Sequence, residues 1–307
     1  MILVTGAAGK TGQAVVRALS ARGESARALV RRAEQVAQLK ALGAQEALVG
    51  DMLNEADLQR ATDGARAVYH IPPNVSPYEV EMGERLIAAT RSANVQHFVY
   101  HSVLRPQIEA MPHHWLKMRV EEALLASGLS FTILQPCAYM QNVAAHERSI
   151  LERGAYPIPY PPQTRLSLVD LEDVAQAAAI VLTEADWYNA VVELVGTAGM
   201  TQDEVALALS ETLACPVEAQ VVPLAEWQAQ ARAAGMGEYQ IETLSAMFQY
   251  YAQQGLSGNP RLLQFLLNRA PTSFAEYIQR TMQALSQVNT PRTLRTDKEN
   301  VYEASSI

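Results

Sequence analysis

The sequence predicts an α/β fold, in which a parallel sheet is covered by helices and followed by a smaller, mainly helical C-terminal part. In the first half, short apolar runs rich in Val, Ile and Leu alternate with stretches of helical spacing, the pattern of strands joined by crossover helices. A glycine-rich turn separates the first apolar run from the first helical stretch. Residues 201 to about 286 are mostly of helical character.

Six strands are expected in the first half, and they are Ile2–Thr5, Ser25–Val30, Glu46–Val49, Ala67–Ile71, Gln96–His101 and Ser130–Leu134. The helices between them are expected at 11–22, 33–42, 54–62, 78–93 and 113–127. Each helix is followed by a residue suited to a C-cap, namely Gly23, Gly43, Gly64, Asn94 and Gly128. Right-handed crossovers then place the carboxyl ends of the strands along one edge, where ligands of such sheets bind.

The later segments are less regular. The proline-rich stretch "YPIPYPPQ" at 156–163 is expected to form an ordered connection or a pocket wall. Further elements are a strand end with an apolar helix at 168–182, a strand at 190–196 and a strand-like piece at Pro216–Val222. The expected organisation is a sheet domain at 1–154 with contributions from about 164–196, a mainly helical substrate-side subdomain at 155–286, and a flexible tail at 287–307.

Composition argues against several classes of partner. With 24 basic and 32 acidic residues the net charge is −8, so no general attraction to nucleic acid or to an anionic membrane is expected. Only Cys137 and Cys215 occur, which suits a reducing compartment rather than a disulfide framework. The longest apolar runs are too short to span a bilayer, and "MILVTG" at the start is not a leader-like segment. A cytoplasmic location is therefore expected.

The segment "VTGAAGKTG" at 4–12 has two interpretations, an ATPase phosphate loop or a dinucleotide loop. The ATPase loop requires a glycine five positions before Gly9, where this chain has Val4. Gly6, Gly9 and Gly12 instead lie between the first strand and the first helix, where backbone amides and the helix N-terminus can face a pyrophosphate. The sequence therefore predicts dinucleotide binding on a doubly wound, Rossmann-type sheet.

The end of the second strand indicates which dinucleotide is preferred. An NAD-binding chain would place an acid there to accept hydrogen bonds from the ribose, whereas this chain has Arg31 and Arg32. Guanidinium groups can bind a 2′-phosphate, which favours NADP(H) over NAD(H). The alternative is that both arginines face solvent at a helix start. Lys10 in the glycine loop could likewise reach that phosphate or point to water.

A third position follows the third strand, in "LVGDM". Asp51 could accept a hydrogen bond from the adenine amino group while Met52 packs on the ring. The alternative role for Asp51 is a helix N-cap, although Asn54 could cap the same helix and leave Asp51 for the ligand.

Several segments together resemble one family. The glycine loop, the basic strand end and "GDM" occur with "HFVYHSVLRP" at 97–106 and "HHWLKMRVEEALLASGLSFTILQPCAYMQN" at 113–142. Over roughly residues 1–285 the chain resembles the NmrA-like group of atypical short-chain dehydrogenases/reductases. That group includes NADP-sensing regulators and NAD(P)H-dependent reductases of quinones, azo dyes and triphenylmethane dyes.

The resemblance implies cofactor contacts at matching positions. The pyrophosphate loop would consist of Gly6, Ala8, Gly9, Lys10, Thr11 and Gly12, with Arg31 and Arg32 on the 2′-phosphate side and Asp51 with Met52 at the adenine. The ribose and nicotinamide side would be lined by Ile71, Pro72, Pro73, Lys117 and the segment Pro136 to Tyr139, with Asn142 matching a recurrent family asparagine.

The catalytic candidates are His113, Lys117 and Tyr139. In the wider superfamily a tyrosine precedes the active-site lysine by four residues, and here that position is His113, which argues against ordinary alcohol–ketone chemistry and against an epimerase. A histidine could still donate a proton near neutral pH. The alternatives are that His113 and His114 form a solvated first turn, that Lys117 pairs with Glu121, and that Tyr139 fills the core.

Other matches are less informative. Ser102 occupies the place of the superfamily's active-site serine. Cys137 is interpreted as structural, because no basic residue or second cysteine adjoins it. No zinc-like ligand spacing and no Gly-x-Ser-x-Gly motif occur, so neither a metal site nor a hydrolase is expected.

The resulting hypothesis is an NAD(P)H-dependent reductase that transfers a hydride to an electron-poor conjugated small molecule, such as a quinone or an azo compound. The acceptor would bind between the strand ends and the C-terminal part, where aromatic residues are available at Trp115, Tyr139, Tyr156, Tyr160, Trp227, Phe248 and Tyr250. The rival hypothesis is an NADP(H) sensor without turnover. The oligomeric state stays open, with a homodimer as the working hypothesis.

Overall fold

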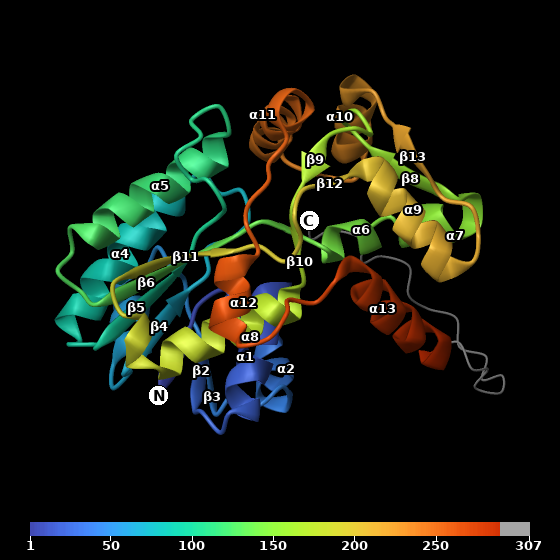
Figure 1. The fold of residues 1–307 in the computed structure, drawn as a ribbon. Helices are drawn as coiled ribbons and strands as arrows, with labels where there is room; N and C mark the ends of the chain where they lie inside the picture. The colour runs from blue at the N-terminus through green and yellow to red at the C-terminus, as the bar shows by residue number, and fades with distance from the viewer. Residues whose placement is uncertain (289–307) are drawn as a thin grey trace.

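The computed structural model describes residues 1–288, and its centre is a seven-stranded parallel sheet of order β11-β6-β5-β4-β1-β2-β3 (Figure 1). The strands are β1 (Ile2–Val4), β2 (Ala26–Val30), β3 (Glu46–Val49), β4 (Ala67–His70), β5 (His97–His101), β6 (Phe131–Pro136) and β11 (Ala190–Leu194). The chain starts in the middle of the sheet at β1, builds one side with β2 and β3, and then builds the other with β4, β5, β6 and β11. The doubly wound fold is therefore confirmed.

Helices cover both faces of this sheet (Figure 1). Those of the crossovers are α1 (Lys10–Ala21), α2 (Gln35–Ala41), α3 (Glu55–Thr62), α4 (Glu79–Ser92), α5 (Pro112–Leu125) and α8 (Leu171–Thr183). The buried residues form two apolar clusters, one under α1, α2 and α8 and one under α3, α4 and α5. Both faces of the inner strands are thus buried, which explains their continuous rather than alternating apolar sequence, whereas the edge strands β3 and β11 are partly exposed.

Local signals set the ends of the crossover helices as expected. Gly23, Gly43, Gly64, Asn94 and Gly128 all have a positive φ, the left-handed conformation that follows many helix C-termini. Asn54 caps α3 by accepting from the Asp57 amide at 3.1 Å, and Asp170 caps α8 in the same way through the Glu172 amide. These short-range contacts fix where each crossover turns back to the sheet.

The C-terminal part has its own small apolar cluster. Its further elements are β7 (Ala138–Tyr139), α6 (Gln141–Ala144), α7 (Glu147–Arg153), β8 (Ala155–Ile158), β9 (Arg165–Leu166), β10 (Leu168–Val169), β12 (Met200–Thr201), α9 (Gln202–Leu213), β13 (Glu218–Val221), α10 (Leu224–Ala233), α11 (Glu238–Gln254), α12 (Arg261–Leu267) and α13 (Phe274–Val288), with a short 3-10 turn at Ala185–Trp187. The predicted tail, 287–307, lies outside the described residues except for its first two positions, which end α13.

Two features of this part differ from the sequence reading. The proline-rich stretch at 156–163 begins inside strand β8, because β13 supplies a parallel backbone partner from more than sixty residues away, as in the pairing of Ala155 with Glu218. Helix α12 returns to the sheet domain and packs against α8 and β11. Within residues 1–288, no helix is both long and apolar enough to cross a membrane.

Candidate active site

The glycine loop lies at the carboxyl end of the central strand β1, beside the loop that follows β4. The chain switches direction of winding between these two strands, and ligands of doubly wound sheets bind at such a point. Gly6 has φ +59°, and a Cβ there would press on the Ile71 carbonyl oxygen. A Cβ at Gly12 would lie 2.5 Å from the Ala7 Cα. The loop therefore has its tight shape because these two positions have no side chain.

The N-terminus of α1 is open to a ligand. Gly9 is the N-cap residue and no side chain among the described residues caps the helix, so the first-turn amides of Lys10, Thr11 and Gly12 have no intrahelical acceptor. Amides and the helix dipole at such an end favour an anion. The residues of the loop thus fit the pyrophosphate of a dinucleotide, the group that the sequence predicts there.

Replacing Gly12 with alanine is expected to weaken dinucleotide binding at least tenfold, because the new methyl group cannot fit against Ala7 unless the loop opens. Gly128→Ala is the matched control, because Gly128 follows α5, away from the glycine loop, and nothing lies within 4 Å of a Cβ built there, while its φ of +76° also disfavours a side chain. Titration of the dinucleotide by fluorescence measures both variants. Equal affinities for the two would contradict this account of the loop.

The basic side chains near the loop differ in what they contact. Lys10, Arg31 and Arg32 are all exposed. Arg32 forms an ion pair with Glu34 at 3.0 Å, whereas neither Arg31 nor Lys10 has a carboxylate partner within residues 1–288. Arg31 is therefore the guanidinium at the end of β2 that remains available to an anion, and its predicted role on a 2′-phosphate stays a prediction.

The turn after β3 holds Asp51 in a defined position. Its Oδ1 accepts from the Leu53 amide at 2.9 Å, and its own amide donates to Asp57. Because Asn54 caps α3, Asp51 is not needed there, and its side chain is exposed. Met52 is 7% exposed and packs in the apolar cluster under α3, so little of its side chain is available to an adenine ring.

The loop after β4 is tied to β1. The Ile71 amide donates to the Thr5 hydroxyl oxygen at 3.0 Å, and the same oxygen lies 3.0 Å from Nδ1 of His70. Ile71 and Pro72 are buried and Pro73 is exposed. These contacts place the loop after β4, which carries the predicted ribose-side residues, next to Gly6 of the glycine loop.

Helix α5 carries the predicted catalytic histidine and lysine, and both are buried. His113 and His114 are 9% and 1% exposed, so the alternative of a solvated first turn is wrong. Burial, with smaller contributions from His114 and Lys117, lowers the pKa of His113 from 6.5 to about 3. His113 is therefore neutral near pH 7, which disfavours it as a proton donor there.

Lys117 pairs with Glu79 of α4 rather than with Glu121, so that alternative is also wrong. Its Nζ donates to Glu79 Oε1 at 2.9 Å and lies 5.7 Å from the centre of the Tyr100 ring. The Tyr100 hydroxyl donates to the same Glu79 oxygen at 2.6 Å. The lysine is thus held in a buried ion pair, and its predicted contact with the nicotinamide ribose stays a prediction.

Glu121 has different partners, one turn further along α5. Its carboxylate accepts from the Ser102 hydroxyl and from Gln135 Nε2 at 2.9 Å. Burial raises the pKa of this carboxyl group, against the effect of those two donors. Ser102, which occupies the superfamily's serine position, therefore donates to a buried acid of its own chain.

Tyr139, the third catalytic candidate, lies at the end of a hydrogen-bonded chain. Its hydroxyl oxygen is 2.7 Å from Nε2 of His101, and Nδ1 of that histidine is 2.6 Å from the Tyr69 hydroxyl oxygen. Sequence reasoning missed His101 and Tyr69, together with Glu79 and Tyr100. The available signal was position, because His101 is the last residue of β5, at the sheet edge where ligands of this fold bind.

The segment that leads to Tyr139 is firmly packed. The Pro136 carbonyl accepts from the Leu104 amide at 2.8 Å, and the Cys137 amide donates to the Leu194 carbonyl at 3.1 Å. Burial raises the pKa of the Cys137 thiol to about 12, which agrees with a structural role. Asn142, on the short helix α6, is exposed.

Aromatic residues of the C-terminal part extend the apolar cluster that contains Cys137. Phe248 of α11 packs 5.9 Å from Tyr160 and 4.8 Å from Trp227 between ring centres, and Tyr251 lies 5.9 Å from Tyr160. Tyr139, Tyr160 and Phe248 all pack against this cluster. Tyr156 instead belongs to the separate C-terminal cluster, so it is a core residue of the C-terminal part.

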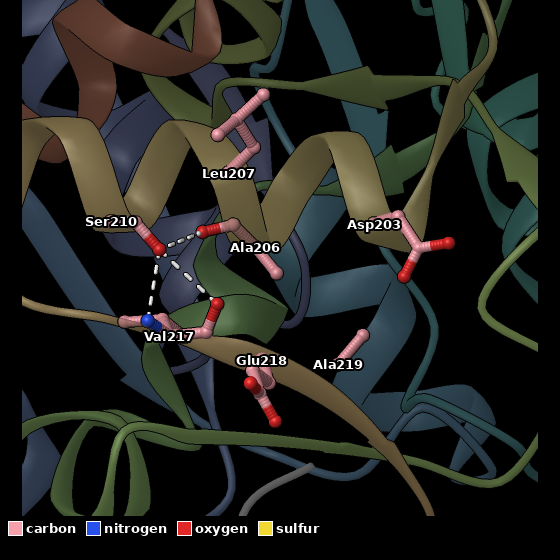
Figure 2. A pocket seen from close by; sticks show the side chains of 7 residues that line it. All are labelled: Asp203, Ala206, Leu207, Ser210, Val217, Glu218 and Ala219. Carbon is pink, nitrogen blue, oxygen red and sulfur yellow. Dashed lines mark hydrogen bonds between the residues drawn. The ribbon is translucent and has the colours of Figure 1, made fainter.

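A surface hollow of about 350 Å³ lies elsewhere, in the C-terminal part (Figure 2). Its lining comes from α9 and the segment around β13, and Ser210 there bonds the backbone of Val217 and Ala206. None of the predicted site residues lines it. Within residues 1–288, no group of three or more His, Cys, Asp or Glu side chains could hold a metal ion.

Comparison with known proteins identifies relatives that match nearly the whole chain. The chain is 29% identical to the NAD(P)H azoreductase of Xenophilus azovorans over 279 residues, which are 90% of this chain and 96% of that protein. It is 26% identical to quinone oxidoreductase 2 of Escherichia coli (strain K12) over 91% of this chain and 97% of that protein. The structure of Citrobacter sp. triphenylmethane reductase complexed with NADP(H) matches with a TM-score of 0.81 at 26% identity, covering 91% and 99% of the two chains. Because the model of the NmrA-like family matches residues 1–286, the chain belongs to the NmrA-like family.

Proposed function

We propose that this protein is an NAD(P)H-dependent reductase of electron-poor conjugated acceptors, such as quinones and azo compounds. The observation that carries the proposal is the glycine loop at the switch point of the sheet, with the uncapped amides of α1 beside it. Similarity over nearly the whole chain to an azoreductase and a quinone oxidoreductase supports the same reaction class.

The chain's own residues would orient the reactants and exclude water. When bound, the reduced nicotinamide supplies the hydride, so the main task of the protein is to hold the two reactants in the correct orientation. The loops after β1 and β4 would hold the dinucleotide, with Tyr139 on the nicotinamide side. Tyr160 and Phe248 would present apolar ring faces to a flat acceptor, on which aromatic stacking is favourable.

The test has two steps. Binding of NADPH is titrated by fluorescence, and NADPH absorbance is then followed with a panel of quinones and azo dyes. Oxidation that depends on the acceptor is the expected result. Tight binding without oxidation by any acceptor would refute the reductase and leave a cofactor sensor.

Arg31 is proposed to select NADP(H) over NAD(H). Arg31→Ala is expected to weaken NADPH binding by roughly tenfold to a hundredfold and NADH binding little, because a charge-assisted hydrogen bond to the 2′-phosphate is lost. Arg32→Ala is the matched control, since Arg32 is paired with Glu34. Fluorescence titration with both dinucleotides measures the ratio, and equal losses for NADPH and NADH would contradict the assignment.

A further inference from the structure

We propose that the Tyr139 hydroxyl donates the proton of the reaction, and that His101 and Tyr69 fix the direction in which its hydrogen points. The inference rests on the proposed function, because a proton is consumed only when an acceptor is reduced. The three side chains form one line of hydrogen bonds, in which His101 lies between the two phenols. They come from the last two residues of β4, β5 and β7, and the Tyr69 carbonyl accepts from the amide of Thr5, the residue before Gly6, at 3.0 Å.

His101 is neutral over the physiological range of pH. Burial, reinforced by the charge of Lys117 and by His70, lowers its pKa from 6.5 to about 3. A neutral imidazole has one N–H group and one bare nitrogen. Its two phenol partners must therefore be bound differently, one as a donor to the ring and the other as an acceptor from it.

The surroundings of Tyr69 decide between the two arrangements. Tyr69 is 0% exposed, and Nδ1 of His101 is the only hydrogen-bond partner of its hydroxyl among the described residues. If Tyr69 accepted from Nδ1–H, its own hydroxyl hydrogen would be buried without an acceptor, which disfavours that tautomer roughly tenfold or more. Tyr69 therefore donates to Nδ1, the ring proton is on Nε2, and Nε2–H donates to the Tyr139 oxygen.

This arrangement leaves the hydrogen of Tyr139 unused by His101. Tyr139 is half-buried, and its hydroxyl has no hydrogen-bond partner other than His101 among the described residues. Burial raises the pKa of the phenol, and the Thr11 side chain of the glycine loop lowers it to a smaller extent. The Nε2–H of His101 would also stabilise the phenolate that forms when the proton leaves. The Tyr139 hydrogen is thus available to a ligand held beside the first turn of α1.

Acceptors differ in how much they need this proton. In an azo compound, one nitrogen takes the hydride from the reduced nicotinamide C4–H, the N=N π bond breaks, and the second nitrogen keeps the electron pair. That strongly basic nitrogen takes the Tyr139 proton to give a hydrazine, and the Tyr139 phenolate regains a proton from water. A quinone gives a hydroquinone monoanion, a phenolate of ordinary basicity that can be released as the anion and then takes its proton from water. Tyr139 therefore matters more for azo bonds than for quinones.

The tautomer of His101 tests the hydrogen-bond direction without turnover. In protein labelled with ¹⁵N histidine, the His101 signals are identified by their loss in His101→Gln, and they are expected to show a protonated Nε2 and a bare Nδ1. Tyr69→Phe is expected to give a mixture of tautomers. Tyr156→Phe is the matched control, because it also removes a buried hydroxyl, bonded to Gln202 at 3.1 Å, but in the C-terminal cluster. A protonated Nδ1 in the wild type would overturn the proposal.

Kinetics test the proton donor itself. Tyr139→Phe is expected to lower azo reduction by about a hundredfold or more and quinone reduction by less than about tenfold. Tyr69→Phe, which touches no ligand, is expected to lower azo reduction severalfold more than quinone reduction. Equal losses for both acceptors would overturn the role of Tyr139. A wild type that oxidises NADPH with neither acceptor would instead refute the proposed function, and the tautomer would still decide the hydrogen-bond direction.

Discussion

Replacing Lys117 with methionine is expected to lower the free energy of unfolding by about 3–5 kcal/mol, as is typical when one partner of a buried ion pair is removed. The side chains of Lys117 and Glu79 are only 11% and 3% exposed. Without the ammonium group, the Glu79 carboxylate would stay buried with the Tyr100 hydroxyl as its remaining donor in the described part of the chain. Urea denaturation followed by circular dichroism measures the loss.

Two further variants make this result interpretable. Lys117→Met combined with Glu79→Gln removes both charges and is expected to recover most of the lost stability. Arg85→Met breaks the exposed pair with Glu81 and is expected to cost about 0.5 kcal/mol or less. If Lys117→Met cost no more than Arg85→Met, the pair between α4 and α5 would contribute no more than a surface ion pair.

The same double variant separates the structural role of Lys117 from its predicted role at the nicotinamide ribose. A stable double variant that binds NADPH as tightly as the wild type would show that the lysine serves the packing of α4 on α5. A stable variant with weakened binding would show that its ammonium group also contacts the cofactor. Fluorescence titration of NADPH gives this answer directly.

Acidification from about pH 7 to about pH 4.5 is expected to destabilise the fold steeply. Burial lowers the pKa of five histidines from 6.5 to about 3 or 4. They are His70, His97, His101, His113 and His114. At a pH between the unfolded pKa of 6.5 and the lowered folded pKa, the unfolded chain binds protons that the folded chain does not. The free energy of unfolding is therefore highest above about pH 6.5 and falls as the pH drops toward 4. Each histidine contributes up to about 1.4 kcal/mol per pH unit.

The free energy of unfolding measured in urea at a series of pH values tests this prediction. His97 lies away from the glycine loop, and its Nε2 is hydrogen-bonded to the Thr132 hydroxyl. His97→Gln removes this titrating group and is expected to reduce the slope of the free energy of unfolding against pH. Glu121 acts in the opposite direction, because burial raises its pKa and its protonation favours the folded state at low pH. A free energy that stays constant between pH 7 and pH 5 would show that these imidazoles are protonated as easily in the folded protein as in water.

Much of the fold follows from short stretches of sequence. The inner strands of the first half are continuous apolar runs because both their faces are covered, and the crossover helices end where glycine or Asn94 adopts a left-handed conformation. The glycine turn between β1 and α1 was also predictable, since Gly6 has a left-handed φ and Gly12 packs against its neighbour Ala7. Each of these signals acts over a few neighbouring residues.

The pairing of β8 with β13 was not predictable in the same way. The stretch "YPIPYPPQ" contains prolines that argue for a loop, yet its first residues form a strand because a partner backbone is brought alongside. Helix α12 shows the same effect on a larger scale, as it leaves the C-terminal part to cover α8 and β11. Neither partner is marked in the sequence near the element concerned.

The features of the candidate site can be separated in the same way, into those set by local sequence and those set by tertiary packing. The sequence by itself determined the parallel sheet, the glycine loop and the basic end of β2, because hydrophobic period, glycine spacing and strand ends are local properties. The tertiary structure alone decided that Lys117 pairs with Glu79 and that His101 joins Tyr69 to Tyr139. Those partners are separated by 32 to 38 positions in the chain and meet only when strands and helices pack, where burial then sets their charge and the direction of their hydrogen bonds.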